Sequence, residues 1–412
     1  MQSAFVEEEN GDTLNDSIWL RNTTVEEMYN VDIKGYTIKG GRNSQKLNDL
    51  TKSILSGDKE FDVAYIPGEL TSVILSKPDY LIPLSDIETL DLTHTWWDQA
   101  SAEAMTIMGN TLSATGDLIV SMTGSSTITL FNKRIAADND IDVYGIVRSG
   151  KMTFAEMYAL AKDVIADLNG DGVMSPDDDR FGICFEAMNL GMFVEAAGEH
   201  LSGINEDGVP ELMLDTPRVA EIVQHFIGII DDYDVCCGPE SRMRKISLDK
   251  FFSEERLFML ITNLQRMNAA RSYTTDFGVI PFPKYEESDE YSAPVNTYWS
   301  SWLMIPSTQD DTDRCGTILD ALGYYSQKYV TPAFIDTSIT TKSIRDNDSA
   351  EMLEMILDNK VFDIGDFFDW GHILLYVMAM NHNKDIASAF ASEQGKIDAS
   401  IASFIEAYSS QN

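Results

Sequence analysis

The chain lacks the signatures of several large protein classes. It has no apolar run of the ~18 to 20 residues that a membrane-spanning helix needs. It has no GxGxxG or GxxxxGKS/T loop for phosphate groups, and no HExxH or GxSxG motif. The common marks of nucleotide-dependent enzymes, zinc proteases and α/β-hydrolases are therefore missing. A glycoside hydrolase is not excluded, because its pair of carboxylates follows no short motif.

Basic residues are scarce. The 412 residues include 30 Lys and Arg against 67 Asp and Glu, which gives a formal net charge of -37. Nucleic acid and anionic lipid both attract clustered positive charge, so this balance argues against both partners. The acidic residues are spread along the chain, which favours a well-hydrated surface. Attraction of a cationic ligand is the alternative interpretation.

Histidine and cysteine are also rare. The five histidines are scattered without metal-ligand spacing, and we expect them to be surface or hydrogen-bonded residues: His94, His200, His225, His372 and His382. The four cysteines form no CxxC pattern: Cys184, Cys236, Cys237 and Cys315. We expect buried thiols. A disulfide within the adjacent pair, or from that pair to Cys184, is the alternative.

Residues 167–178 (DLNGDGVMSPDD) form the most specific local motif. Oxygen-bearing side chains alternate in its first half, and Gly172 supplies the sharp turn found in calcium loops of the EF-hand type. The segment after the loop reads as a strand rather than a second helix, so we expect one isolated, structural calcium site. An acidic turn that binds no ion is the alternative. The predicted calcium ligands are Asp167, Asn169, Asp171, the carbonyl of Val173, Ser175 and the short side chain of Asp178.

Alternating strand and helix patterns predict an α/β protein with two or three domains. A strand over residues 31–38, a helix over 44–57 and a strand over 61–66 would form a β-α-β unit, which implies a parallel sheet. Further strands are predicted over 118–122 and 127–131.

Tryptophan is placed among small and polar residues. In sugar-binding clefts a flat ring covers the C–H face of the sugar, while Asp, Asn, Gln or Glu bind the hydroxyls. The pattern favours a carbohydrate site, and burial of each tryptophan in a hydrophobic core is the alternative. The tryptophans concerned are Trp96, Trp97, Trp299, Trp302 and Trp370.

Several segments in order resemble one known family. The order is similar to that in the extracellular solute-binding proteins of bacterial ABC importers, the family that includes maltose-binding proteins, and most of all to lipoproteins of gut Gram-positive bacteria. The resemblance covers nearly the whole chain. One departure is that only Ala4, Phe5 and Val6 precede residue 7, where the family has a hydrophobic strand. The segments are 7–16 (EEENGDTLND), 21–22 (RN), 25–31 (VEEMYNV), 130–133 (LFNK), the 167–178 loop and 276–285 (DFGVIPFPKY).

The resemblance implies a two-lobed, type II periplasmic-binding-protein-like fold. Each α/β lobe would be a mostly parallel sheet flanked by helices, and a hinge of crossing strands would join the lobes with the ligand between them. Residues 1–117 with 296–345 would form the first lobe. Residues 118–295 with 346–412 would form the second lobe, which carries the calcium-like loop.

The resemblance also implies which residues face the ligand. The crossings would pass near residues 116–118 and 283–295, so side chains beside them are candidates. No catalytic residue is expected. The predicted ligand-binding residues are Glu69, Trp97, Ser121, Thr123, Ser125, Asn263, Gln265, Trp299 and Trp370.

As a function, the resemblance implies a non-catalytic, extracytoplasmic protein that presents a small solute, a mono- or oligosaccharide, to an ABC permease in the membrane. It implies a monomer held at the cell surface as a lipoprotein. The sequence shows no signal peptide or lipid-anchored cysteine, and residues 1–3 read as an expression start, so we expect both to have been removed. Two alternatives stay open: a secreted polysaccharide hydrolase and a calcium-dependent surface binding protein.

Overall fold

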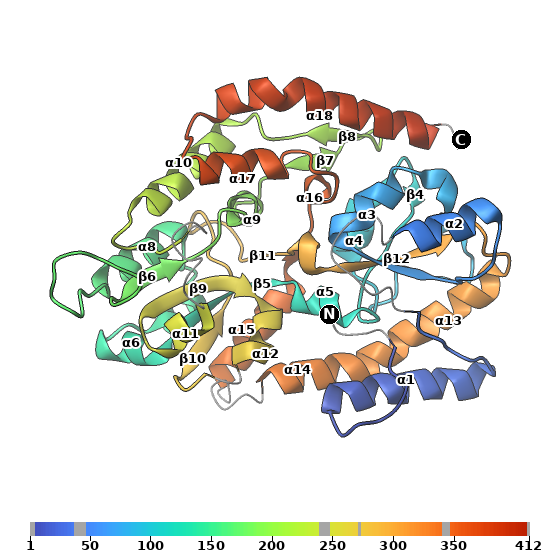
Figure 1. Ribbon diagram of the computed structural model, residues 1–412, viewed down its shortest axis with the longest axis horizontal. Coiled ribbons are helices and arrows are strands. Elements are labelled where there is room, and N and C mark those ends of the chain that lie inside the picture. The colour runs from blue at the N-terminus through green and yellow to red at the C-terminus, as the bar shows by residue number, and fades with distance from the viewer. Residues whose placement is uncertain (1–4, 37–46, 239–247, 271–272, 340–346, 410–412) are drawn as a thin grey trace.

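The computed structural model describes residues 5–36, 47–238, 248–270, 273–339 and 347–409, which form two α/β lobes (Figure 1). The strands are β1 (Ala64–Pro67), β2 (Leu81–Ile82), β3 (Thr106–Ile107), β4 (Asn110–Thr111), β5 (Thr127–Asn132), β6 (Phe181–Cys184), β7 (Ser202–Ile204), β8 (Pro210–Leu212), β9 (Leu257–Asn263), β10 (Phe277–Ile280), β11 (Ala293–Pro294), β12 (Ser301–Pro306) and β13 (Lys360–Val361).

Helices surround the sheets in both lobes. They are α1 (Thr13–Tyr29), α2 (Asn48–Ser56), α3 (Gly68–Leu75), α4 (Gln99–Ala104), α5 (Val120–Gly124), α6 (Lys133–Asp138), α7 (Val143–Arg148), α8 (Phe154–Asp163), α9 (Asn189–Ala196), α10 (Pro217–Asp231), α11 (Leu248–Ser253), α12 (Met267–Ala270), α13 (Thr312–Tyr325), α14 (Thr331–Ile339), α15 (Asn347–Asp358), α16 (Ile364–Phe368), α17 (His372–Met380) and α18 (Ile386–Ser409). Turns that the site uses are η5 (Leu264–Arg266), η6 (Thr297–Trp299) and the π-helical η7 (Ser326–Val330). None of the helices in the described parts of the chain has both the length and the apolar character needed to span a bilayer.

The larger sheet has the strand order β10-β5-β9-β6. Its central strand β5 has all six residues buried, and β-branched and aromatic side chains make this segment a strong strand former. β5 pairs antiparallel with β9 and with β10, whereas β6 pairs parallel with β9. Helix α8 covers β6 and helix α15 packs against β10, so the sheet is enclosed by helices as in other α/β folds.

The smaller sheet has the order β1-β12-β2, and both of its pairings are antiparallel. Helix α3 begins directly after β1 and packs against both β1 and β12. β12 reaches this sheet only after the chain has passed through the larger sheet, so its neighbours are distant in sequence. The predicted α/β class is confirmed, but the larger sheet is mixed and the smaller one antiparallel, rather than both mostly parallel.

Two local predictions were wrong. Residues 118–122, predicted as a strand, lead into the short helix α5, because the apolar run is buried on all sides and gives no strand periodicity. Residues 31–36 form no strand, and 37–46, the remainder of the expected strand and the start of the expected helix, lie outside the described residues. The strand over 127–131 is confirmed as β5.

Backbone pairing holds the connections between the lobes together. Ser126 forms an antiparallel bridge with Val295, and the Asn296 N–H donates to the Ser125 carbonyl at 3.0 Å. β11 pairs in parallel with β13, and Lys360 of β13 forms an ion pair with the buried Asp98. Three segments that pass between the lobes are thus joined side by side.

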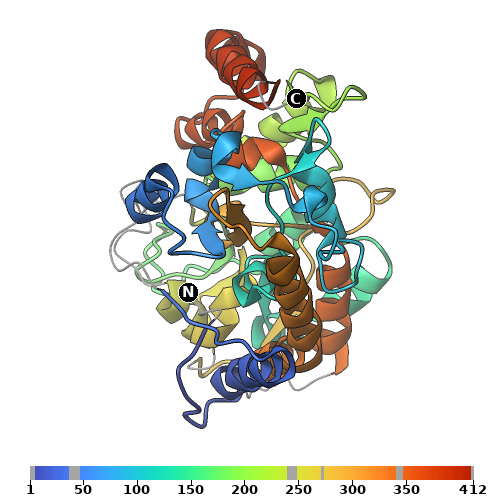
Figure 2. The same ribbon diagram turned by 90° about the vertical axis from the view of Figure 1, so that its right-hand side faces the viewer.

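Helix α1 packs into hydrophobic clusters on both sides of these connections. Leu14 and Ile18 join the cluster around β5 and β9, whereas Val25 joins the cluster around β12. The helix lies along α13, η7 and α14, as both views show (Figure 1, Figure 2). Between its two ends, Arg21 is buried, and burial lowers the pKa of its guanidinium to about 10.

The last helices also contribute to both sides. Trp370 and Phe404 pack with the β12 cluster, whereas Leu375 and Phe390 pack with a third cluster, which contains Phe258 and Met259 of β9. The packing of the C-terminal segment therefore does not assign it to one lobe. The lobe boundaries given from the sequence stay a prediction.

We expect Leu130→Ala in β5 to lower the free energy of unfolding by about 2 to 5 kcal/mol, because the side chain is fully buried between neighbouring strands. Denaturant-induced unfolding of the purified protein measures this change. Leu55→Ala on α2 is the matched control: Leu55 is 68% exposed, so its effect should stay within about 0.5 kcal/mol. Equal losses in the two variants would contradict the placement of β5 at the centre of the core.

Candidate ligand-binding site

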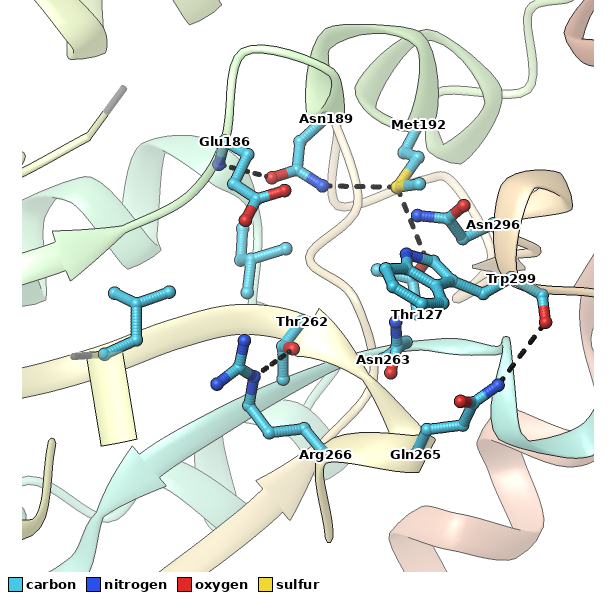
Figure 3. Close-up of a pocket in the computed structure, with 12 residues that line it drawn as sticks. Thr127, Glu186, Asn189, Met192, Thr262, Asn263, Gln265, Arg266, Asn296 and Trp299 are labelled. Atoms are coloured by element: carbon cyan, nitrogen blue, oxygen red, sulfur yellow. Dashed lines mark hydrogen bonds between the residues drawn. The ribbon is translucent and has the colours of Figure 1, made fainter. Parts of the chain in front are cut away.

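A cavity of about 280 Å³ lies at the carboxyl end of β9. Figure 3 shows residues at the start of α9 on one wall, the end of β9 with η5 on the opposite wall, and η6 along one side. Neutral amides and hydroxyls are the most numerous groups in the lining, which suits a ligand with many hydroxyl groups. The lining residues are Thr127, Glu186, Asn189, Met192, Leu248, Ile261, Thr262, Asn263, Gln265, Arg266, Asn296 and Trp299.

Trp299 is the aromatic residue of this lining. Its side chain is 41% exposed, and the Asn263 amide lies beside it in Figure 3. The Trp299 N–H donates to the Asn296 carbonyl at 3.1 Å, which closes the η6 turn beneath the indole. A half-exposed indole beside amides can stack on the C–H face of a sugar ring while the amides bind its hydroxyls.

The end of β9 supplies the polar wall. The first five residues of β9 are buried in the sheet, and the last two, Thr262 and Asn263, are half-buried. Asn263 is paired with Thr127, and the next residue donates its N–H to the Ser126 carbonyl at 3.0 Å. The apolar part of the strand therefore fixes the sheet, and its polar end is held at the cavity, where ligands bind in open α/β sheets.

The wall formed by α9 was not predicted from the sequence. Asn189 is buried, its Oδ1 accepts the Glu186 N–H at 2.6 Å, and its Nδ2 donates to the Met192 sulfur at 3.3 Å. The hydroxyl oxygen of Thr127 lies 3.4 Å from the same sulfur. These residues follow the end of β6, and the rule that ligands bind beyond strand ends could have pointed to them.

Arg266 brings a guanidinium to the cavity, but acidic and hydroxyl partners hold it. Its Nη1 donates to Asp249 at 2.8 Å and its Nε to the Thr262 hydroxyl at 3.0 Å. Partial burial lowers the pKa of Arg266, but Asp249 and Tyr273 together raise it, and the net shift of that pKa is upward. The guanidinium is thus a fixed donor whose charge Asp249 balances.

Three of the predicted ligand-binding residues, Asn263, Gln265 and Trp299, lie together in this lining. Ser121, Thr123 and Ser125 do not: they are buried on α5 or directly after it, and the Ser125 hydroxyl donates to the Ser121 carbonyl at 2.6 Å.

Glu69 lies in the first turn of α3, outside the cavity lining. The preceding Gly68 donates its N–H to the Ser300 carbonyl at 3.0 Å. Glu69 therefore lies next to η6 on the side of the smaller sheet.

Trp97 and Trp370 are core residues and do not face the cavity. Trp97 is 2% exposed and its indole N–H donates to Asp320 at 3.1 Å. Trp370 is 1% exposed and donates to the Ser400 hydroxyl at 3.0 Å. Both indoles are buried and hydrogen-bonded within the protein. Polar neighbours in the sequence therefore did not indicate a sugar-stacking surface at these two positions.

The first half of the predicted calcium loop is held in a tight turn by its own side chains. The Asp167 carboxylate accepts the N–H groups of Gly170 at 2.6 Å and Gly172 at 2.7 Å. Asn169 accepts the Asp171 N–H, and Asp171 accepts the Val173 N–H, each at 2.8 Å. The backbone N–H bonds that Asp167 itself accepts, led by the one from Gly172, lower the pKa of its carboxyl group.

Asp179, which was not among the predicted ligands, closes the loop. It is fully buried, and its two oxygens accept the N–H groups of Leu168 and Ser175, both at 2.8 Å. In the described part of the chain, no three His, Cys, Asp or Glu side chains are gathered as a metal-binding group. The oxygen donors of the loop suit a hard cation such as calcium.

No protein-family model matches the chain, and no curated protein matches it. Solved structures do match. An ABC substrate-binding protein of Listeria monocytogenes in complex with cycloalternan is 14% identical over 95% of this chain and 97% of its own, with a TM-score of 0.64. UgpB of Mycobacterium tuberculosis in complex with glycerophosphocholine is 12% identical over 95% and 96%, with a TM-score of 0.64.

A third similar structure is the maltose/maltodextrin-binding domain MalE of Bdellovibrio bacteriovorus bound to maltotriose. It is 16% identical over 96% of each chain, with a TM-score of 0.54. Two of the three are binding proteins by name, the third was solved with a bound ligand, and each is matched along nearly its whole length. The chain therefore has the two-lobed, type II fold of the solute-binding proteins of ABC importers.

Proposed function

We propose that this protein is the extracytoplasmic solute-binding component of an ABC importer and that it binds a mono- or oligosaccharide. The observation that carries the proposal is the half-exposed Trp299 among amide side chains at the carboxyl end of β9. Stacking on the indole would supply affinity, and the amides of Asn263 and Asn296 would distinguish hydroxyl patterns. The ligand would draw the two lobes together, and the membrane permease would sense the closed form.

The solved structures support this proposal. Two of the three carry an oligosaccharide, cycloalternan or maltotriose, and the third carries glycerophosphocholine. At such low identity the fold is shared while the ligand differs between members, so the sugar assignment depends on the residues of this cavity. As part of the same proposal, the protein lies outside the cytoplasmic membrane, is held there by a lipid anchor and is monomeric.

The hydrolase alternative finds no support in the cavity. A glycoside hydrolase needs two carboxyl groups that flank the scissile bond, and Glu186 is the one carboxylate among the described residues of the lining. Glu195 on α9 has its pKa raised well above the usual range, first by burial and then by Asp366 and Asp363. It is 2% exposed and lies outside the lining, so it cannot meet a substrate there.

We further propose that the 167–178 loop binds calcium as a structural ion. Asp167, Asn169 and Asp171 would supply side-chain oxygens, Val173 its carbonyl, and Ser175 and Asp178 the remaining ligands. The bonds from Gly170 and Gly172 already hold Asp167 in the turn, and Asp179 already holds both ends of the loop together, which supports the proposal.

We expect the protein to bind one class of sugar and Trp299→Ala to weaken that binding at least about tenfold, because a central aromatic anchor is lost. A thermal-shift screen against mono- and oligosaccharides, with peptides and polyamines as controls, identifies the ligand. Isothermal titration calorimetry then gives the dissociation constants.

The matched control is Tyr324→Ala on α13, which removes another half-exposed aromatic outside the cavity lining. Its sugar affinity should equal that of the unmodified protein. An unchanged affinity in Trp299→Ala would contradict the proposed cavity, and a response only to peptides or polyamines would overturn the carbohydrate assignment.

We expect calcium to raise the melting temperature and a chelator to reverse the rise. A free calcium concentration about 100 times the dissociation constant adds about 2.7 kcal/mol of stability when the unfolded chain does not bind the ion. Differential scanning calorimetry with and without calcium measures the shift. Asp171→Asn should reduce it, because that change removes the negative charge of a proposed ligand.

The control for this measurement is Asp207→Asn, in the exposed turn between β7 and β8. Calcium should stabilise this variant as much as the unmodified protein. A melting temperature that does not respond to calcium in the unmodified protein would reject the metal site and leave an acidic turn.

A further inference from the structure

The side chain of Gln265 contacts α5 and η6, which lie beside two of the three segments that pass between the lobes. Its Nε2 faces the Trp299 carbonyl of η6 at 3.4 Å and the Ser121 carbonyl of α5 at 3.5 Å, and Figure 3 shows the first of these contacts. Gln265 itself belongs to η5, directly after β9. One amide thus links the end of the ligand-facing strand to two segments that are far apart in sequence.

Gly124 makes room for this side chain. A Cβ atom at position 124 would lie 2.5 Å from Cγ of Gln265 and 3.4 Å from its Nε2. Because the first distance is shorter than any ordinary carbon contact, alanine at position 124 would displace the Gln265 side chain. Position 124 therefore provides a way to move Gln265 without changing its chemistry.

The η6 turn, which carries Trp299, also contacts the start of helix α3. The Gly68 N–H donates to the Ser300 carbonyl at 3.0 Å. A Cβ atom at position 68 would lie 1.7 Å from the Thr297 carbonyl oxygen, so the start of α3 contacts the η6 backbone directly. η6 is thereby clamped between Gly68 of α3 on one side and Gln265 of η5 on the other.

We infer that Gln265 is a positioning residue that acts through Trp299, and not primarily a ligand contact. It fixes the backbone of η6 against α5 and β9, so a ligand stacked on the indole acts beside two of the segments that pass between the lobes. This inference deepens the proposed sugar-binding function and rests on it for its ligand. The clamp on η6 is a property of the free protein and can be tested without any ligand.

The chemistry of the amide makes a sharp prediction. Both contacts need a donor, because both partners are carbonyl oxygens. Gln265→Met keeps a long, flexible side chain but removes the donor. Gln265→Glu keeps the shape but places a carboxylate opposite two carbonyls, which disfavours the observed arrangement. Both variants should loosen η6, and the Glu variant should do so more.

Hydrogen–deuterium exchange of the ligand-free protein tests the clamp. In the unmodified protein the N–H groups of Asn296, Trp299 and Ser300 donate to backbone carbonyls, so their exchange is slowed. We expect exchange in this segment to be several-fold faster in Gln265→Met and in Gly124→Ala. Gly228→Ala on α10 is the matched control, because a Cβ there meets nothing within 4 Å, and its exchange in this segment should be unchanged.

The ligand arm uses the sugar identified by the thermal-shift screen. Gln265→Met should weaken binding about five- to tenfold, the effect of one lost hydrogen bond, at an unchanged melting temperature. A variant that combines Gln265→Met with Trp299→Ala should bind no more weakly than Trp299→Ala alone, because the two residues act as a unit. A direct contact between Gln265 and the ligand would instead give additive losses.

The outcomes distinguish the positioning role of Gln265 from the proposed binding of a sugar. Unchanged exchange around η6 in both Gln265→Met and Gly124→Ala would overturn the positioning role, and so would additive losses of affinity. Failure of the unmodified protein to bind any sugar would reject the proposed ligand class, and the exchange measurement would then decide the clamp by itself.

Discussion

The backbone pairing between the two connections is the constraint on which the rest of the structure depends. Ser126 is bridged to Val295, and the Thr127 hydroxyl donates to the Pro294 carbonyl at 2.6 Å. This pairing sets where β5 begins and where η6 turns, so it fixes both the polar end of the larger sheet and the indole of Trp299. The cavity is therefore built at the junction between the lobes, where a small relative movement changes its shape most.

Features with short-range causes could be read from the sequence. Thr153 caps α8 by accepting the Glu156 N–H, and Thr216 caps α10 ahead of Pro217, because a hydroxyl at a helix start satisfies a free donor locally. β5 followed from a run of apolar and β-branched residues. In the site, Asn263 and Trp299 were expected from the resemblance to solute-binding proteins, which places ligand contacts beside the crossing segments.

Features that depend on distant neighbours could not be read in this way. The direction of β12 beside β1 is set by a chain path through the other lobe, and no local periodicity encodes it. Trp97 and Trp370 share their polar sequence context with Trp299, but Asp320 and Ser400, far along the chain, bury and satisfy their indoles. Asn189 and Met192 became site residues only when β6 was placed beside β9.

Helix α1 has a mechanical consequence. The first half of α1 packs with one hydrophobic cluster and its second half with the other. The helix therefore joins the two clusters along one edge of the molecule. Neither lobe has a complete surface without it, so a fragment carrying a single lobe would expose an apolar strip.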